Sequence, residues 1–108
     1  MDKEISPEKA LHYLASTDEA FAKARAMVKY LEHKRKTIKA EAYLRAPGNT
    51  INERESNAYT CKEMKDFLEE YKDAVYDEQI LASKRKSAEL AIEVWRSTNS
   101  NRRAGMVT

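Results

Sequence analysis

Two short runs of basic residues are the side chains whose chemistry is easiest to assign. They are His33-Lys34-Arg35-Lys36, followed by Lys39, and Lys84-Arg85-Lys86. Lysine and arginine neutralise nucleic-acid phosphates without reading base sequence, so both runs are candidate DNA contacts. Consecutive residues of a helix fan around its circumference, so either run can also be an ordinary solvated helix surface. The sequence leaves both interpretations open.

The segment around the lone tryptophan carries three more candidate phosphate contacts, Arg96, Arg102 and Arg103. In the same interpretation Trp95 stacks on a base, as aromatic side chains do in single-strand binding proteins. The alternative is that Trp95 anchors the end of a helix against an N-terminal helix. The polar residues that follow it then form a flexible tail over residues 99–108.

Acidic residues recur at helical spacing in the second half of the chain. This acidic row comprises Asp66, Glu70, Asp73 and Asp77, joined by Glu63, Glu69 and Glu78. Like charges at these spacings repel one another by a few tenths of a kcal/mol, so we expect cations of a neighbouring helix to face them, namely Lys23, Arg25 and Lys29. A nucleic-acid mimic or a metal-binding cluster is the alternative.

No residue set predicts catalysis, a cofactor or a metal site. A di-iron helical bundle needs Glu-x-x-His pairs, and neither His12 nor His33 has a glutamate three residues before it. The chain lacks a glycine-rich phosphate loop and the common hydrolase motifs. Cys61 lies on an apolar helix face and is expected in the core. We therefore expect a protein that is not an enzyme.

The composition predicts an all-α protein of one domain. The 108 residues include 20 Lys and Arg against 18 Asp and Glu, for a net charge of +2, but only two glycines and two prolines. Ala, Glu, Lys, Leu and Arg dominate, as in long helices and coiled coils. No apolar run is long enough for a membrane span or a signal peptide, and a single cysteine excludes an intrachain disulfide, so we expect a cytoplasmic protein without membrane contact.

Capping and breaking residues predict where the helices lie. Ser6-Pro7 starts a short helix over 6–15, and Ser16 with Glu19 has capping-box spacing, so a second helix over 17–46 either starts there or continues the first. Pro47 and Gly48 predict a turn over 47–51, followed by a long helix over 51–97. These elements make an antiparallel helical hairpin domain over 1–98, in which Phe21 faces Tyr76 and Tyr30 faces Phe67.

Two helices leave part of each apolar face uncovered. Large apolar residues off the main seam are expected to need another surface: Met27, Tyr43, Leu44, Ile80, Leu90 and Val94. The sequence therefore predicts a homodimer that forms a four-helix bundle.

Several segments carry a resemblance to phage proteins: Ala10-Leu11-His12-Tyr13-Leu14, Thr17-Asp18-Glu19, Lys84-Arg85-Lys86, Trp95-Arg96-Ser97 and Arg102-Arg103. In these segments the chain resembles a group of small uncharacterised bacteriophage and prophage helical proteins, often encoded in early regions beside recombination or single-strand-binding genes. The resemblance implies a role in phage DNA metabolism or in interference with the host, and it assigns no role to any residue.

These observations predict a non-enzymatic accessory protein of phage DNA recombination or replication that binds DNA or a DNA-bound protein. The alternative is a protein-binding inhibitor or modulator of a host nuclease or defence enzyme, with the long helices and the acidic row as its working surface. A structural or assembly factor of the virion is a third possibility.

Overall fold

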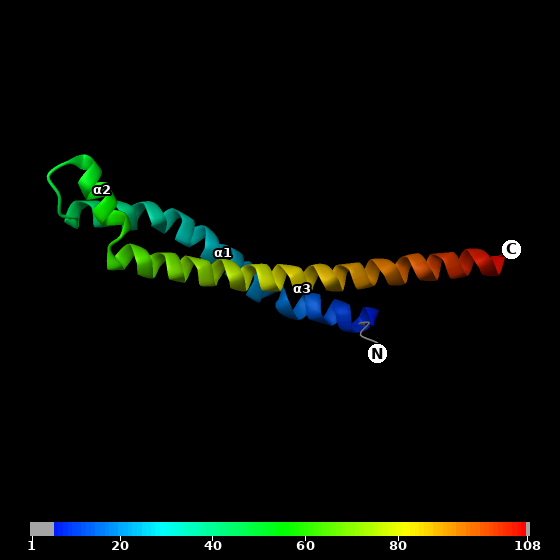
Figure 1. Ribbon diagram of the computed structural model, residues 1–108. Coiled ribbons are helices and arrows are strands. Elements are labelled where there is room, and N and C mark those ends of the chain that lie inside the picture. Colours follow the sequence, from blue (N-terminus) through cyan, green and yellow to red (C-terminus); the bar gives the residue numbers. More distant parts are fainter. Residues whose placement is uncertain (1–5, 108) are drawn as a thin grey trace. The chain divides into compact units, whose positions relative to one another are not determined.

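The computed structural model describes residues 6–107, with side chains over 6–105, and is built of helices. The helices are α1 (Pro7–Arg45), α2 (Ile51–Tyr59) and α3 (Lys62–Val107) (Figure 1). No strand occurs among the described residues. The predicted all-α class is therefore confirmed.

Helix α1 is continuous, so the predicted short helix over 6–15 and long helix over 17–46 are one element. Its start is as expected, because Ser6 Oγ accepts a hydrogen bond from the Lys9 amide at 3.2 Å. No helix starts at Ser16, because the hydroxyls of Ser16 and Thr17 bond to a carbonyl within α1. Ser16 Oγ and Thr17 Oγ1 donate to the carbonyl of Tyr13 at 3.1 and 2.7 Å, a bond to the preceding turn that a residue within a helix makes.

The turn after α1 follows the prediction. Gly48 has a φ of 142°, which only glycine adopts without strain. Thr50 caps α2 by accepting from the Glu53 amide at 3.1 Å, and the Glu53 carboxylate accepts from the Asn49 amide at 3.2 Å. Thr50 and Glu53 therefore cap a helix that starts at residue 51, where the sequence predicts one.

The predicted long helix over 51–97 is interrupted after its first turns, which corrects that prediction. α2 ends at Tyr59, and the Thr60 hydroxyl donates to the carbonyl of Ser56 at 3.1 Å. The break lets α2 fold back on the end of α1, where Arg54 Nη2 donates to the carbonyl of Tyr43 at 3.2 Å. Asn57 Nδ2 also donates to the carbonyl of Pro47 at 2.6 Å.

Helix α3 runs to Val107, beyond the predicted end at residue 97. The predicted flexible tail over 99–108 is therefore helical up to residue 107, and Thr108 lies outside the described residues. Ser, Thr and Asn lower helix propensity by only about 0.5 kcal/mol each, and Arg102, Arg103 and Ala104 are good helix formers. No proline interrupts them.

The chain divides into two compact units. Unit 1 comprises Met1–Ala22 with Gln79–Thr108, and unit 2 comprises Lys23–Glu78. The core of unit 2 is a cluster of Leu31, Met64 and Phe67, none more than 3% exposed, with partly buried residues packed against it: Ile38, Cys61, Tyr71 and Ala74. Cys61 thus lies at the core, as the sequence predicted.

Within unit 2, the contacts between α1 and α3 run antiparallel. Tyr71 Oη donates to the Glu32 carboxylate at 3.3 Å, and further along α1 Arg45 pairs with Glu63 at 3.8 Å. Phe67 packs in the Leu31 cluster and stacks with Tyr71, whereas Tyr30, predicted to face Phe67, is 58% exposed. The pairing of α1 with α3 is shifted from the predicted one, because residues 51–61 form α2 and the break after it and so do not pair with α1 as part of one long helix.

Unit 1 joins the start of α1 to the second half of α3 through small residues. Ala10 of α1 and Ala88 of α3 are both fully buried. Phe21 lies beneath the guanidinium of Arg85, at 5.1 Å. Among the described residues, no helix has an apolar stretch that could traverse a bilayer.

Candidate nucleic-acid interface

The candidate DNA-contacting residues fall into both units. Those of the first basic run, Lys34, Arg35, Lys36 and Lys39, lie on α1 in unit 2. The others lie on α3 in unit 1: Lys84, Arg85, Lys86, Arg96, Arg102 and Arg103. The structure therefore provides two separate basic surfaces, each with its own surroundings.

Two lysines of the first run lie over aromatic rings of their own unit. Lys34 Nζ lies 5.8 Å from the ring centroid of Tyr30, and Lys39 Nζ lies 4.9 Å from that of Tyr59. The hydrogen bond and charge interaction with Tyr59 raise the pKa of Lys39. An ammonium over a ring face is held by the ring quadrupole. The Lys39–Tyr59 contact joins α1 to α2, whereas Lys34 and Tyr30 both lie on α1.

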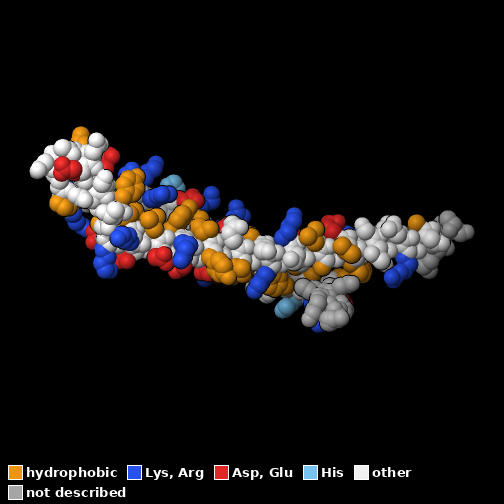
Figure 2. Space-filling model, in the orientation of Figure 1, with side chains coloured by type: hydrophobic (Ala, Val, Ile, Leu, Met, Phe, Trp, Pro, Cys, Tyr) orange, Lys and Arg blue, Asp and Glu red, His pale blue; other side chains and the backbone are white. Residues whose placement is uncertain are grey.

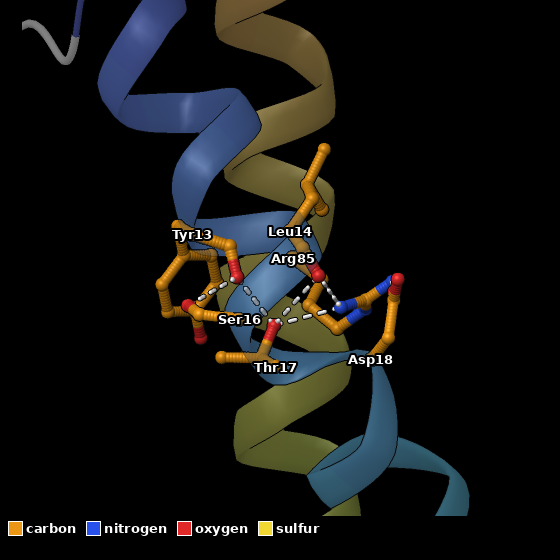
Figure 3. Close-up of polar contacts among 6 residues, drawn as sticks. All are labelled: Tyr13, Leu14, Ser16, Thr17, Asp18 and Arg85. Atoms are coloured by element: carbon orange, nitrogen blue, oxygen red, sulfur yellow. Dashed lines mark hydrogen bonds and ion pairs between the residues drawn. The ribbon is translucent and has the colours of Figure 1, made fainter.

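Arg85 is largely buried, with a side chain only 15% exposed. Its Nη1 donates to Oγ1 of Thr17 at 2.7 Å and to the carbonyl of Leu14 at 2.8 Å (Figure 3). Its Nη2 donates to the carboxylate of Asp18 at 2.7 Å. We refer to Arg85 with Leu14, Thr17, Asp18 and Phe21 as the Arg85 cluster. The guanidinium faces α1, where its donors are bound by Leu14, Thr17 and Asp18.

The apolar pattern of α3 explains why an arginine lies at this place. Inward-facing residues of α3 follow a spacing of three, four or seven: Met64, Phe67, Tyr71, Ala74, Leu81, Ala88 and Ile92. Arg85 falls on the same heptad series, four residues after Leu81 and three before Ala88. In the second basic run, Arg85 therefore contacts α1 and takes part in the pairing of the two helices. Its position in the heptad series is the sequence signal that could have identified this role.

The remaining basic residues of α3 are exposed. Lys84 and Lys86 flank Arg85 on the solvent side, and Arg102 and Arg103 lie near the end of the helix. Arg96 is 67% exposed and pairs with Glu93 at 3.4 Å. Glu93 is the last acidic residue of the sequence, so the chain after it carries only positive side chains among its charged residues. On the face drawn in Figure 2, white atoms predominate at this end of α3, with blue side chains among them.

The helical state of α3 after residue 96 places polar side chains in a defined pattern. Asn99 follows Arg96 by three residues, and Arg103 follows Asn99 by four. Residues at this spacing share one face of a helix. The sequence-based expectation of a flexible tail missed this face, since it treated the polar stretch as a helix end. Trp95, just before it, is 50% exposed.

The acidic row lies on the first half of α3, and two of its members pair within that helix. Lys62 Nζ contacts the Asp66 carboxylate at 2.9 Å, and Lys72 Nζ contacts that of Glu69 at 3.1 Å. Each carboxylate raises the pKa of its lysine through the hydrogen bond and the charge. Across residues 6–107, no group of three His, Cys, Asp or Glu side chains converges to hold a metal ion.

A hollow of about 500 Å³ lies between α1 and α2 in unit 2. Its floor is mostly apolar and its rim is charged; the lining residues are Lys36, Lys39, Ala40, Tyr43, Leu44, Glu55 and Ala58. Leu44 on this lining is 73% exposed, and Ile51 and Tyr59 of α2 are 66% and 50% exposed. The sequence did not predict this feature, because α2 was not expected as a separate helix.

Comparisons with known protein families, curated proteins and solved structures found no match to the chain.

Proposed function

We propose that the chain is a non-enzymatic accessory protein of phage DNA recombination or replication, and that its DNA-binding surface is the second half of α3. One observation carries the proposal. From Val94 to Gly105, α3 continues as an exposed helix that bears three arginines and no acidic residue. Arginines in such a segment can neutralise phosphates, and the ion pair between Arg96 and Glu93, at 3.4 Å, is exposed.

The exposed lysines of the second run add to this surface. Lys84 and Lys86 lie on the same helix as Arg103, so the basic residues span about 28 Å along the axis at 1.5 Å per residue. A span of this length is comparable to most of one turn of duplex DNA, about 34 Å. Arg85 is not part of this surface, because its guanidinium binds α1 in the Arg85 cluster.

A dimer of helical hairpins, joined as a four-helix bundle, is part of the proposal. Large apolar side chains are exposed in unit 1, among them Leu11 at 58%, Leu90 at 53% and Val94 at 63%. A second copy that covers such residues would bury them and present two basic surfaces to one duplex. Light scattering coupled to gel filtration tests this part: a mass of two chains supports it, and a mass of one chain at all concentrations contradicts it.

Fluorescence anisotropy of a labelled 20-base-pair duplex at 50 and 200 mM salt tests DNA binding. We expect binding at the lower salt that weakens at least tenfold at the higher, because counterions compete for phosphates. The triple variant Arg96→Gln, Arg102→Gln, Arg103→Gln should lose most of this binding. The matched control, Lys34→Gln, Arg35→Gln, Lys36→Gln on α1, should keep it. No binding by the native chain at 50 mM salt would remove the proposal.

The hollow between α1 and α2 supports a second candidate, a protein-binding inhibitor or modulator of a host nuclease or defence enzyme. Its apolar floor beside Leu44 suits the apolar face of a partner helix. Affinity capture from host lysate with the native chain and with Leu44→Glu tests it. A nuclease or defence enzyme retained by the native chain alone supports this candidate, and recovery of only phage DNA-replication proteins contradicts it.

A further inference from the structure

We propose that the end of α3 enters the major groove of duplex DNA and reads base edges through Arg96, Asn99 and Arg103. The inference rests on the proposed DNA binding and adds to it a substrate form and a sequence preference. Phosphate contacts alone would not discriminate among sequences, whereas side chains aimed at base edges do.

The first step is that this part of α3 lies beyond its partner helix. Arg85 contacts Leu14, Thr17 and Asp18, and the two helices run in opposite directions in unit 1 (Figure 1). At equal rise per residue, the start of α1 at Pro7 then comes opposite about residue 95 of α3. From Glu93 to Gly105 the side chains are exposed, apart from the half-buried Asn99. Among the described residues, α1 does not accompany this stretch.

The second step is size. An α-helix with its side chains is about 10–12 Å across, and the major groove of B-DNA is about 12 Å wide. The rise from Arg96 to Arg103 is about 10 Å. That length corresponds to about three base pairs, each of which occupies about 3.4 Å of the duplex axis. Among the described residues, α1 begins opposite about residue 95 of α3; the stretch of α3 after that residue can enter the groove, whereas the paired part is too broad.

The third step is the chemistry of the shared face. An asparagine amide makes a bidentate pair with adenine N6 and N7, and an arginine guanidinium does so with guanine O6 and N7. Asn99 lies between two arginines on one face, so the face offers one adenine reader flanked by two guanine readers. Glu93 holds Arg96 only through an exposed contact at 3.4 Å, which costs little to exchange for a base. Arg102 lies off this face and is placed for a phosphate.

The fourth step is the composition of the segment. Ser97-Thr98-Asn99-Ser100-Asn101 is a run of poor helix formers, each about 0.5 kcal/mol less favourable than alanine. Hydrogen-bonding capacity, rather than helix stability, is the property that these residues share.

Selection from a pool of duplexes with a randomised centre tests the inference with the native chain. We expect enrichment of a core of about three base pairs that contains both guanine and adenine. Asn99→Ala should then lower affinity for the enriched sequence about 5- to 100-fold, with affinity for a scrambled duplex unchanged. The matched control Arg102→Ala should weaken binding to both duplexes by the same factor. Circular dichroism of each variant, compared with the native chain, verifies the fold.

The outcomes separate this inference from the proposed function. If the native chain binds duplexes with a steep salt dependence but enriches no sequence, or if Asn99→Ala changes both affinities equally, groove reading is overturned and phosphate binding stands. If the chain prefers single-stranded DNA of the same sequence, groove reading is overturned as well. If it binds no DNA at low salt, the proposed function fails and the inference fails with it.

Discussion

Nη1 of Arg85 on α3 lies 2.7 Å from Oγ1 of Thr17 on α1, at a place where the heptad series of α3 would otherwise hold an apolar side chain. The same hydroxyl donates to the carbonyl of Tyr13 at 2.7 Å, so Thr17 accepts and donates at once. A charged side chain with this many bonds can fix one register between two helices, because a shift of either helix breaks all of them together.

Truncation of Arg85 should destabilise the protein, whereas its replacement with an apolar side chain of similar length should have only a small effect. Arg85→Ala leaves Phe21 uncovered and opens space in the seam, so we expect a loss of about 2 kcal/mol in the free energy of unfolding. Arg85→Met fills the space, and the Thr17 hydroxyl keeps its bond to Tyr13, so the loss should stay within about 1 kcal/mol. Urea denaturation followed by circular dichroism measures both.

Lys86→Ala is the control for this prediction. Lys86 is exposed on the same turn of α3, and its replacement should change the free energy of unfolding by less than about 0.5 kcal/mol. Equal effects of Arg85→Ala and Lys86→Ala would mean that the Arg85 cluster does not contribute to stability.

A double-mutant cycle between Thr17 and Arg85 should show that the two residues are coupled. Thr17→Val removes the acceptor while it keeps the shape of the side chain, and the effects of Thr17→Val and Arg85→Met should be non-additive by about 1 kcal/mol. The same denaturation experiment on the two single variants and the double variant gives the coupling. Additive effects would show that the 2.7 Å contact carries no energy.

Truncation in the core of unit 2 should be among the most damaging single changes. Leu31 is fully buried against Met64 and Phe67, so Leu31→Ala should cost about 3 kcal/mol and lower the midpoint of thermal unfolding by more than about 10 °C. Leu44→Ala, at a residue 73% exposed, is the matched control and should leave the midpoint nearly unchanged. Similar losses at both positions would contradict the arrangement of this core.

The two glycines should respond to alanine in opposite directions. At Gly48, with φ at 142°, an added Cβ would lie 2.9 Å from Cβ of Glu53, so Gly48→Ala should destabilise by about 1–3 kcal/mol. At Gly105, inside α3, an added Cβ meets nothing within 4 Å, and Gly105→Ala should raise the helix content of the segment, by up to about 1 kcal/mol of helix propensity. Differential scanning calorimetry detects the first effect and circular dichroism the second.

Capping chemistry and composition predicted the helical class, the start of α1 and the start of α2. The break at Thr60 was not predictable from the sequence, because no glycine or proline lies near it. The Thr60 hydroxyl donates to the carbonyl of Ser56, and the Ser16 hydroxyl within continuous α1 donates to the carbonyl of Tyr13 in the same way, so this bond does not by itself decide whether a helix ends. The local sequence shows which side chains can bond to the backbone, but tertiary contacts determine whether the helix continues past them.

The candidate site was predictable in its residues but not in their roles. The sequence identified Arg85 and Arg103 equally as basic, and only the contacts of α1 separate an occupied guanidinium from an exposed one. The shared face of Arg96, Asn99 and Arg103 required α3 to continue past residue 97. A flexible segment does not place residues on a common face, so this pattern could be recognised only after the segment was known to be helical.

Chemical-shift mapping by NMR, with the ¹⁵N-labelled protein titrated with a duplex, tests most directly where DNA is bound. We expect the largest changes at backbone amides of residues 94–105, smaller changes near Lys84 and Lys86, and unchanged amides at Leu31, Met64 and Phe67. Changes centred on Lys34, Arg35 and Lys36 of α1, or no changes at low salt, would contradict the account.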